Sequence, residues 1–275
     1  MKHQCFTLRD LRTSVDFDAC FQLQSATWGA NYAELVPKSI LRLAQRLGGV
    51  AAGAFDETDR MVGLVFGIPG VEQSKLVHWS DMLAVLPEVQ NQGLGEALKR
   101  YQRAALLERG VERMYWSFDP LEARNAYFNF VRLGIYAAKY VRDFYGDSAS
   151  PLHRGIGTDR LIATWEFSSP RVEARLNRQD APATCADIPI VNPLLGDDSE
   201  RSSEPRLIDA DAVRVAVPAG IQQLKQSRPD VAREWRAHTR AAFEHYLSRH
   251  YVVVDFVRTT TGGTYVLQRE TALLS

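Results

Sequence analysis

The sequence predicts an α/β (α+β) protein with a mixed central sheet flanked by helices and a smaller C-terminal α/β unit. Three observations carry this prediction. Apolar runs of strand length alternate with amphipathic runs of helix length over residues 1–168. A glycine-bearing turn at residues 90–95 joins a strand pattern directly to a helix pattern. A pattern of one helix followed by two strands then occurs near the C-terminal end.

The first half of the large unit combines a strand, two helices and an antiparallel hairpin. Gly48 and Gly49 mark the end of the second helix, because glycine commonly follows a helix C-terminus. A polar tetrapeptide of hairpin-loop length joins the two strands of the hairpin. The expected ranges are residues 6–11 for the first strand, 16–28 and 37–47 for the helices, and 50–55 and 61–68 for the hairpin strands.

The second half of this unit alternates strands with helices. Leu94, Leu98, Tyr101 and Ala105 lie on one helical face, and Gly110 follows at the position of a C-terminal cap. The other expected ranges are residues 76–86 and 111–118 for strands, 121–133 for a helix, and 135–144 and 161–167 for two further strands.

A change in composition divides the chain into three parts. Residues 168–206 hold five prolines with clusters of serine and acidic residues, which predicts a largely irregular linker. Its one apolar segment, residues 188–195, is suited to docking as an extended strand. The expected parts are residues 1–168 for the large unit, 169–206 for the linker and 207–275 for the C-terminal unit.

The C-terminal unit has two interpretations. Ala126 and Phe130 in the large unit, and Ala242 and Tyr246 in the small one, each place an alanine four residues before an aromatic near a helix-to-strand junction. The small unit is therefore either a half-copy of the large one or an ordinary helix–strand–strand unit. Its expected elements are strands at residues 212–217, 251–258 and 264–269 and a helical stretch over 219–249 with a break at Pro229.

Charge and composition exclude several classes of protein. The 275 residues include 33 Lys+Arg and 33 Asp+Glu, and residues 1–168 contain 19 of each, so neither part has the basic surplus that nucleic-acid phosphates attract. The longest apolar stretch, residues 61–71, is too short to cross a bilayer. A charged N-terminus and three distant cysteines favour a reducing cytoplasm. We therefore expect a cytoplasmic protein without nucleic-acid or membrane partners.

The turn at residues 90–95 has the properties of an anion-binding site. Gly93 and Gly95 allow the backbone to approach a ligand closely, and the helix that follows presents unpaired N–H groups and the positive end of its dipole. The spacing lacks the G-x-G-x-x-G pattern of dinucleotide-binding folds and the G-K-[ST] of a P-loop. A turn that binds no ligand remains the alternative.

This turn resembles the Q/R-x-x-G-x-G/A signature of the GNAT superfamily of N-acyltransferases, with Gln90, Gly93 and Gly95 in place after a V-x-P-E run. The order of elements over residues 1–168 is also similar to that family. The resemblance implies a GNAT fold and an acyl-CoA cosubstrate, acetyl-CoA or succinyl-CoA. It implies that coenzyme A contacts Leu83, Ala84, Val85, Gln90, Asn91, Gln92, Gly93, Leu94, Gly95 and Asn125.

A second segment, residues 118–130, resembles a GNAT subgroup of predicted acyltransferases that also have a similar C-terminal half. The resemblance implies transfer of an acetyl or other short acyl group to a small-molecule primary amine such as an amino acid. Two positions depart from the family pattern. Asn125 lies two residues later than the common asparagine, and Phe130 stands where the family often has a tyrosine that protonates the departing thiolate.

The predicted reaction needs a base that deprotonates the acceptor amine. The candidates are Asp81, His78 and Asp119, and for Asp119 the alternative is a helix cap before Pro120. A backbone amide of the fourth strand is expected to stabilise the oxyanion. The candidate acids for the thiolate are Tyr127, Tyr136 and Tyr140.

A different class of function is also compatible with these residues. Phe130 at the usual acid position favours an acyl-CoA-binding or scaffold module with reduced catalysis. A homodimer through the C-terminal unit agrees with either interpretation. Lys99, Arg100 and Arg103 either meet the 3′-phosphate of coenzyme A or form a solvated helix face. No metal is expected, because the histidines near the C-terminus lack ligand spacing and a completing cysteine or carboxylate.

Overall fold

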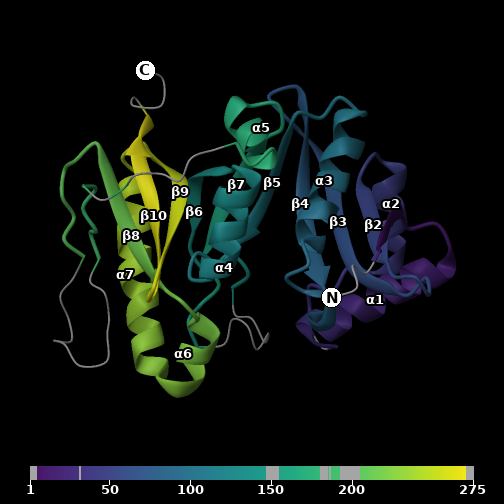
Figure 1. Cartoon of the computed structure of the whole chain (residues 1–275), viewed down its shortest axis with the longest axis horizontal. Coiled ribbons are helices and arrows are strands. Elements are labelled where there is room, and N and C mark those ends of the chain that lie inside the picture. Colours follow the sequence, from purple (N-terminus) through teal and green to yellow (C-terminus); the bar gives the residue numbers. More distant parts are fainter. Residues whose placement is uncertain are drawn as a thin grey trace. The chain divides into compact units, whose positions relative to one another are not determined.

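The computed structural model describes residues 5–30, 32–146, 155–179, 185, 187–192 and 205–270. The chain forms two compact units, of which the first extends to Trp116 and the second begins at Ser117. Figure 1 labels helices and strands of both units. This division falls earlier than residue 168, because the segment after Ser117 packs with the C-terminal elements. The boundaries at residues 168 and 206 stay a prediction.

The first unit contains β1 to β4 and the first four residues of β5, which follow one another in the sheet order β1-β2-β3-β4-β5. The strands β1 to β4 are antiparallel neighbours, and β5 runs parallel to β4. This arrangement confirms the predicted mixed sheet. The bounds are β1 Thr7–Asp10, β2 Val50–Phe55, β3 Met61–Glu72, β4 Lys75–Val85 and β5 Arg113–Phe118.

Three helices flank this sheet. The helices α1 (Ser14–Trp28) and α2 (Lys38–Arg46) pack their apolar side chains against alternate residues of β2, β3 and β4 in one core cluster. The helix α3 (Leu94–Leu107) contacts the same strands through the opposite face, where a side chain at Gly63 would lie 3.1 Å from Leu98 Cδ1. The absence of a side chain at Gly63 therefore lets α3 approach the sheet closely.

The helix α1 begins at a capping box that continues into an ion pair. Thr13 Oγ1 accepts a hydrogen bond from Asp16 N at 3.2 Å, and Asp16 Oδ2 accepts one from Thr13 N at 3.0 Å. Arg9 Nη1 of β1 donates to Asp16 Oδ2 at 2.8 Å. Hydrogen bonding to Arg9 lowers the pKa of Asp16 well below its usual range.

The β3–β4 hairpin is longer than the sequence predicts. Its two turn residues, Gln73 and Ser74, both have positive φ, which matches a two-residue type I′ turn. Strand pairing therefore continues through Pro69, which lies opposite His78, to the end of the hairpin. The expectation that β3 ends at residue 68 was wrong, since the turn chemistry of this pair outweighs the usual preference of Pro69 and Gly70 for loops.

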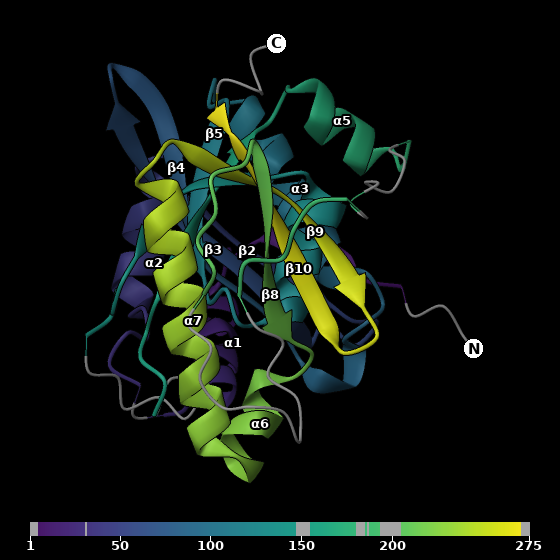
Figure 2. The same ribbon diagram turned by 90° about the vertical axis from the view of Figure 1, so that its left-hand side faces the viewer.

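The second unit contains an antiparallel sheet in the order β7-β6-β9-β10-β8. The helix α7 (Pro229–Leu247) packs along this sheet, and Pro229 separates it from α6 (Ile221–Ser227) as predicted (Figure 2). The strand bounds are β6 Tyr136–Val141, β7 Arg160–Glu166, β8 Ala212–Pro218, β9 Tyr251–Thr259 and β10 Gly262–Arg269.

One predicted element of this unit is corrected, and one helix was not predicted. The single helix expected over residues 121–133 is a short α-helix α4 (Ala123–Ala126) followed by a π-helix η2 (Tyr127–Leu133). The linker, expected to be largely irregular, contains the helix α5 (Pro170–Leu176), which begins at the capping side chain of Ser169. Gly134 has a φ of +77°, and a side chain there would come within 3.1 Å of Val172 Cα in α5, so glycine permits this close packing.

The linker also pairs with the sheet at one position. Ile190 forms an isolated parallel bridge with Arg214 of β8, which agrees with the extended docking predicted for this apolar segment. Residues 180–184, 186 and 193–204 of the predicted linker lie outside the described residues. Among the described residues, no helix combines the length and apolar character needed to cross a membrane.

The ion pair at the start of α1 yields a stability prediction. Asp16→Asn is expected to lower the free energy of unfolding by about 1–2 kcal/mol at pH 7, because it removes a buried charge-assisted hydrogen bond. Since folding lowers the pKa of Asp16, its contribution is complete above about pH 4 and is lost as the pH falls further. Urea denaturation at pH 7 and pH 3 measures this difference. A deficit of equal size at both pH values would contradict it, and Asp18→Asn on the same helix is the exposed control.

Candidate functional site

The predicted anion site lies where β4 ends and α3 begins. The chain leaves Val85 through a short 3-10 turn, η1 (Pro87–Val89), and enters α3 at Leu94. Gln90 Nε2 donates to Val85 O at 3.0 Å and thereby ties the turn to the end of the strand. Asn91 and Gly93 both have left-handed backbone conformations, with φ values of 65° and 82°. The turn is thus a tight connection that ends at the N-terminus of α3.

The glycines of this turn face open space with few protein atoms nearby. A side chain at Gly93 would meet nothing within 4 Å, and one at Gly95 would meet only Leu83 Cδ2 at 3.9 Å. The positive φ of Gly93 explains that glycine, whereas neither backbone strain nor packing requires a glycine at position 95. This open cradle fits a ligand that approaches the backbone closely.

The first turn of α3 can donate hydrogen bonds into this space. The first bond between residues four apart runs from Ala97 N to Gly93 O at 3.0 Å, so the amides of Leu94, Gly95 and Glu96 precede the helical ladder. The carboxylate of Glu96 is neutralised by Arg100, whose Nη2 lies 3.0 Å away. The positive end of the helix dipole therefore favours an anion such as a pyrophosphate.

The end of β4 presents a backbone edge beside the turn. The parallel register between β4 and β5 runs from Val77 opposite Arg113 to Trp79 opposite Tyr115. The last residues of β4, Leu83 to Val85, lie beyond the part of the strand that pairs with β5. They pair with β3 along the other edge of β4. Their position fits the predicted contact with an extended pantetheine arm.

Asp81 occupies a β-bulge in β4. Gly67 of β3 lies opposite Ser80, and Phe66 lies opposite Met82, so Asp81 is the extra residue. Its side chain keeps an exposed surface, yet the surrounding protein removes enough water to raise the pKa of its carboxyl. The charge of Glu34, between α1 and α2, raises this pKa further, while a hydrogen bond from the Trp79 side chain opposes the shift.

His78, the second candidate base on β4, is completely buried. Burial is the main cause that lowers the pKa of His78 to about 3, and it keeps the imidazole neutral. Its Nε2 lies 3.2 Å from Gln102 Nε2, which therefore donates to it. A neutral imidazole in this position is part of the packing between β4 and α3.

The remaining predicted site residues lie in the second unit. Asp119 is buried, and its carboxylate accepts from Leu121 N at 2.8 Å and from Arg236 Nη2 at 2.6 Å. Arg160 Nη1 lies 3.8 Å from the same carboxylate. These contacts explain the burial of Asp119 as a turn cap and ion-pair partner. Its role as a base stays a prediction.

Asn125 and Tyr127 flank the α4–η2 junction. Asn125 is exposed, and Tyr127 is half-buried beneath the guanidinium of Arg258, which lies 3.6 Å from the ring centroid. The two other phenols that could protonate a thiolate donate to carboxylates, Tyr136 to Glu166 and Tyr140 to Asp159. The structure thus brings Asp81 together with the turn in one unit, and the predicted roles of Asn125 and Tyr127 stay predictions.

The sequence analysis missed the charge and polarity around Asp81. Glu34 belongs to a segment without a motif, so only its position in space relates it to the bulge.

Lys99 was expected at the 3′-phosphate or on a solvated helix face, but it is 2% exposed and contacts Ser80 and Trp116. A sequence signal was its spacing from Leu106, seven residues later, which places both residues on one face of α3.

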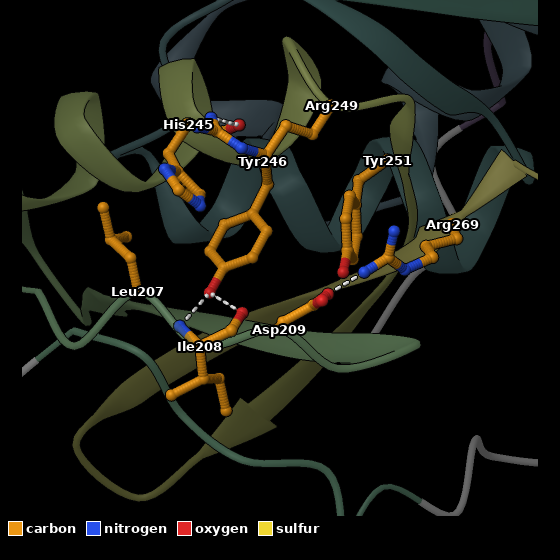
Figure 3. A pocket seen from close by; sticks show the side chains of 8 residues that line it. All are labelled: Leu207, Ile208, Asp209, His245, Tyr246, Arg249, Tyr251 and Arg269. Atoms are coloured by element: carbon orange, nitrogen blue, oxygen red, sulfur yellow. Dashed lines mark hydrogen bonds and ion pairs between the residues drawn. The ribbon is translucent and has the colours of Figure 1, made fainter.

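The second unit has a separate cavity of about 340 Å³, shown in Figure 3. The hydroxyl groups of its two tyrosines form hydrogen bonds with the main chain. Tyr246 OH accepts from Ile208 N and donates to Ile208 O, and Tyr251 OH donates to Ala210 O. Arg269 pairs with Asp209 at the rim. None of the predicted site residues lines this cavity. The lining residues are Leu207, Ile208, Asp209, His245, Tyr246, Arg249, Tyr251 and Arg269.

Comparison with protein families identifies the segment that carries the turn. Residues 17–132 match the model of the acetyltransferase (GNAT) family, and the matched segment includes both the turn and the bulge. This segment belongs to the GNAT family. The resemblance stated from the signature and the order of elements is thereby confirmed. The GNAT subgroup suggested by residues 118–130 stays a prediction.

Solved structures of acetyltransferases are similar to part of the chain. The ribosomal-protein-S18-alanine N-acetyltransferase from Escherichia coli is 20% identical, covers 60% of this chain and 96% of its own, and has a TM-score of 0.45. Aminoglycoside 6′-acetyltransferase type Ii is 18% identical, covers 60% of this chain and 98% of its own, and has a TM-score of 0.47. Comparison with curated proteins found no match.

The described residues also bear on metal binding. Within the ranges that the structure describes, no group of three or more His, Cys, Asp or Glu side chains is arranged to hold a metal ion.

The open cradle predicts the effect of a substitution at Gly95. Gly95→Asp places a negative side chain where no protein atom lies, so it is expected to weaken coenzyme A binding at least tenfold without disturbing the packing. Isothermal titration with coenzyme A measures the affinity. Gly220→Asp, which adds the same charge before α6 at another open glycine, is the matched control. Equal affinities of the Gly95 variant and the control would contradict the prediction.

Proposed function

We propose that this chain is an acyl-CoA-dependent N-acyltransferase that moves an acetyl or other short acyl group, such as succinyl, to a primary amine. The acceptor in this proposal is a small molecule, with an amino acid as the first candidate. The observation that carries the proposal is the open glycine turn at the end of the strand that also presents Asp81. An anion-binding turn and a carboxyl base on one strand are the two parts that amine acylation by a thioester requires.

The residues of the turn would bind and orient the cosubstrate. The amides from Asn91 to Gly95 would hold the pyrophosphate, and the backbone edge of residues 83–85 would align the pantetheine arm. Bound coenzyme A supplies the acyl group as a thioester. Holding the thioester beside Asp81 would convert a bimolecular encounter into a reaction between oriented groups.

Asp81 is the group that would remove the proton from the acceptor. A primary ammonium has a pKa far above that of a carboxyl group, so a base whose pKa is raised accepts its proton more readily. The neutral amine then forms a bond with the acyl carbon, the carbon–sulfur bond breaks, and the thiolate takes up a proton. The resemblance to the GNAT family makes Tyr127 the proposed donor of that last proton. The acidic Glu34 near Asp81 favours a cationic acceptor.

The test of this proposal is thiol release from acyl-CoA. The protein is expected to release coenzyme A from acetyl-CoA or succinyl-CoA when one member of a panel of amino acids and simple amines is present. Asp81→Asn is expected to lower kcat by about 10²–10⁴, because general base catalysis contributes that much. The Asp18→Asn protein, which lacks a carboxylate on the exposed side of α1, is the control.

The pH dependence of the same reaction tests the base directly. The carboxylate form of Asp81 is active, so kcat/KM is expected to fall as the pH drops through a pKa raised above its ordinary value of about 4. The Asp81→Asn protein is expected to lack this acidic limb. An identical limb in the two proteins would assign the base to another group.

The second candidate function is an acyl-CoA-binding or scaffold module. Phe130, at the usual position of the acid, is fully buried among Phe118 and Tyr265, so it contributes packing and no proton. This observation favours the module only if no other phenol replaces the missing tyrosine. Binding of acetyl-CoA without thiol release across the panel would select the module over the enzyme.

A further inference from the structure

A buried polar cluster joins α3 to β4 behind the bulge. Lys99 Nζ donates to Ser80 Oγ at 2.8 Å, Ser80 Oγ donates to Gln102 Oε1 at 2.9 Å, and Gln102 Nε2 lies 3.2 Å from His78 Nε2. Lys99 Nζ also lies 3.8 Å from the centroid of the Trp116 ring. All of these side chains are buried. The α3–β4 polar cluster is defined as His78, Ser80, Lys99 and Gln102.

The cluster coincides with a reversal of the pleat of β4. Ser80 faces α3, since it bonds to side chains of that helix. Met82 belongs to the apolar core cluster formed with α1 and α2, on the other face of the sheet. Residues two positions apart in a regular strand face the same side. Ser80 and Met82 can face opposite sides only because one extra residue, Asp81, stands between them.

We propose that Lys99 and Gln102 are positioning residues for the base of this enzyme. By holding Ser80 toward α3, they locate the bulge at Asp81 and orient its carboxyl toward the side on which Glu34 lies. The inference rests on the proposed function for the role of Asp81. Lys99 and Gln102 would thus act on the base although both are buried in the packing between α3 and β4.

Hydrogen-bond satisfaction explains why the cluster specifies one register. Ser80 has one hydroxyl group, which accepts from Lys99 and donates to Gln102 at the same time. A shift of the bulge by one residue would take this hydroxyl away from α3, and the buried Lys99 amine and the Gln102 Oε1 atom would lose their bonds to it. A buried polar group without a partner is strongly unfavourable, so the register with both bonds prevails.

The charge of Lys99 does not contribute an ion pair to this arrangement. Burial lowers the pKa of Lys99 well below its usual range, which favours the neutral amine. The groups that face it are the Ser80 hydroxyl and the Trp116 ring. The groups that act on Asp81 are Glu34 and the side chain of Trp79. The cluster therefore affects Asp81 through the backbone of residue 80.

A double-mutant cycle tests this coupling. Ser80→Ala is expected to lower kcat/KM about tenfold in the native protein and less than twofold in the Asp81→Asn background, because the serine acts through Asp81. Lys99→Met should lower kcat/KM to a similar extent. Ser80→Thr, which keeps the hydroxyl, should retain most of the native kcat/KM. The affinity for coenzyme A should change less than twofold in every variant. Ser25→Ala, which removes an exposed hydroxyl from α1, is the matched control.

Carbon-13 NMR titration of the Asp81 carboxyl gives a readout that needs no turnover. The raised midpoint is expected to move toward the ordinary aspartate value in Ser80→Ala and Lys99→Met and to stay unchanged in Ser25→Ala. An unchanged midpoint in both cluster variants, or equal losses of kcat/KM with and without Asp81, would overturn the inference. If the native protein releases no thiol with any amine, the proposed enzyme fails, and the titration still decides whether the cluster positions Asp81.

Discussion

The packing of α3 against β4 is the constraint on which the candidate site depends. The helix contributes its N-terminus to the glycine turn and its buried face to the α3–β4 polar cluster, while the strand carries Asp81 and the backbone edge of residues 83–85. One interface thus determines both where an anionic cosubstrate would bind and where a base would stand. A change in the depth of this packing would move both groups together.

The two units accommodate buried charged side chains in different ways. In the first unit, buried Lys99 has a serine partner and a lowered pKa, so no buried counter-charge is needed. In the second unit, buried charges occur as ion pairs, such as Asp119 with Arg236 at 2.6 Å and Asp159 with Arg240 at 2.6 Å. Backbone amides at one turn supply the proposed anion contact, so a basic surface is not needed.

Most elements were predictable because their signals are local. The periodicity of α3, the break at Pro229 and the alternation of β6 to β10 are visible within short windows. The departures have non-local causes: η2 is a π-helix in a segment with ordinary helical periodicity, and α5 packs against Gly134 from a proline-rich stretch. Phe130 illustrates the same limit for function, since only its aromatic neighbours show that it belongs to the core.

The sequence by itself determined the GNAT signature, because Gln90, Gly93 and Gly95 act through a turn whose geometry depends on adjacent residues. It also determined which carboxyl groups were candidates for the base. Only the tertiary structure decided between their environments: Asp119 is enclosed by arginines, whereas Asp81 stands in a bulge near another acid. A pKa and a bulge depend on neighbours that are distant in sequence, and folding alone brings those neighbours together.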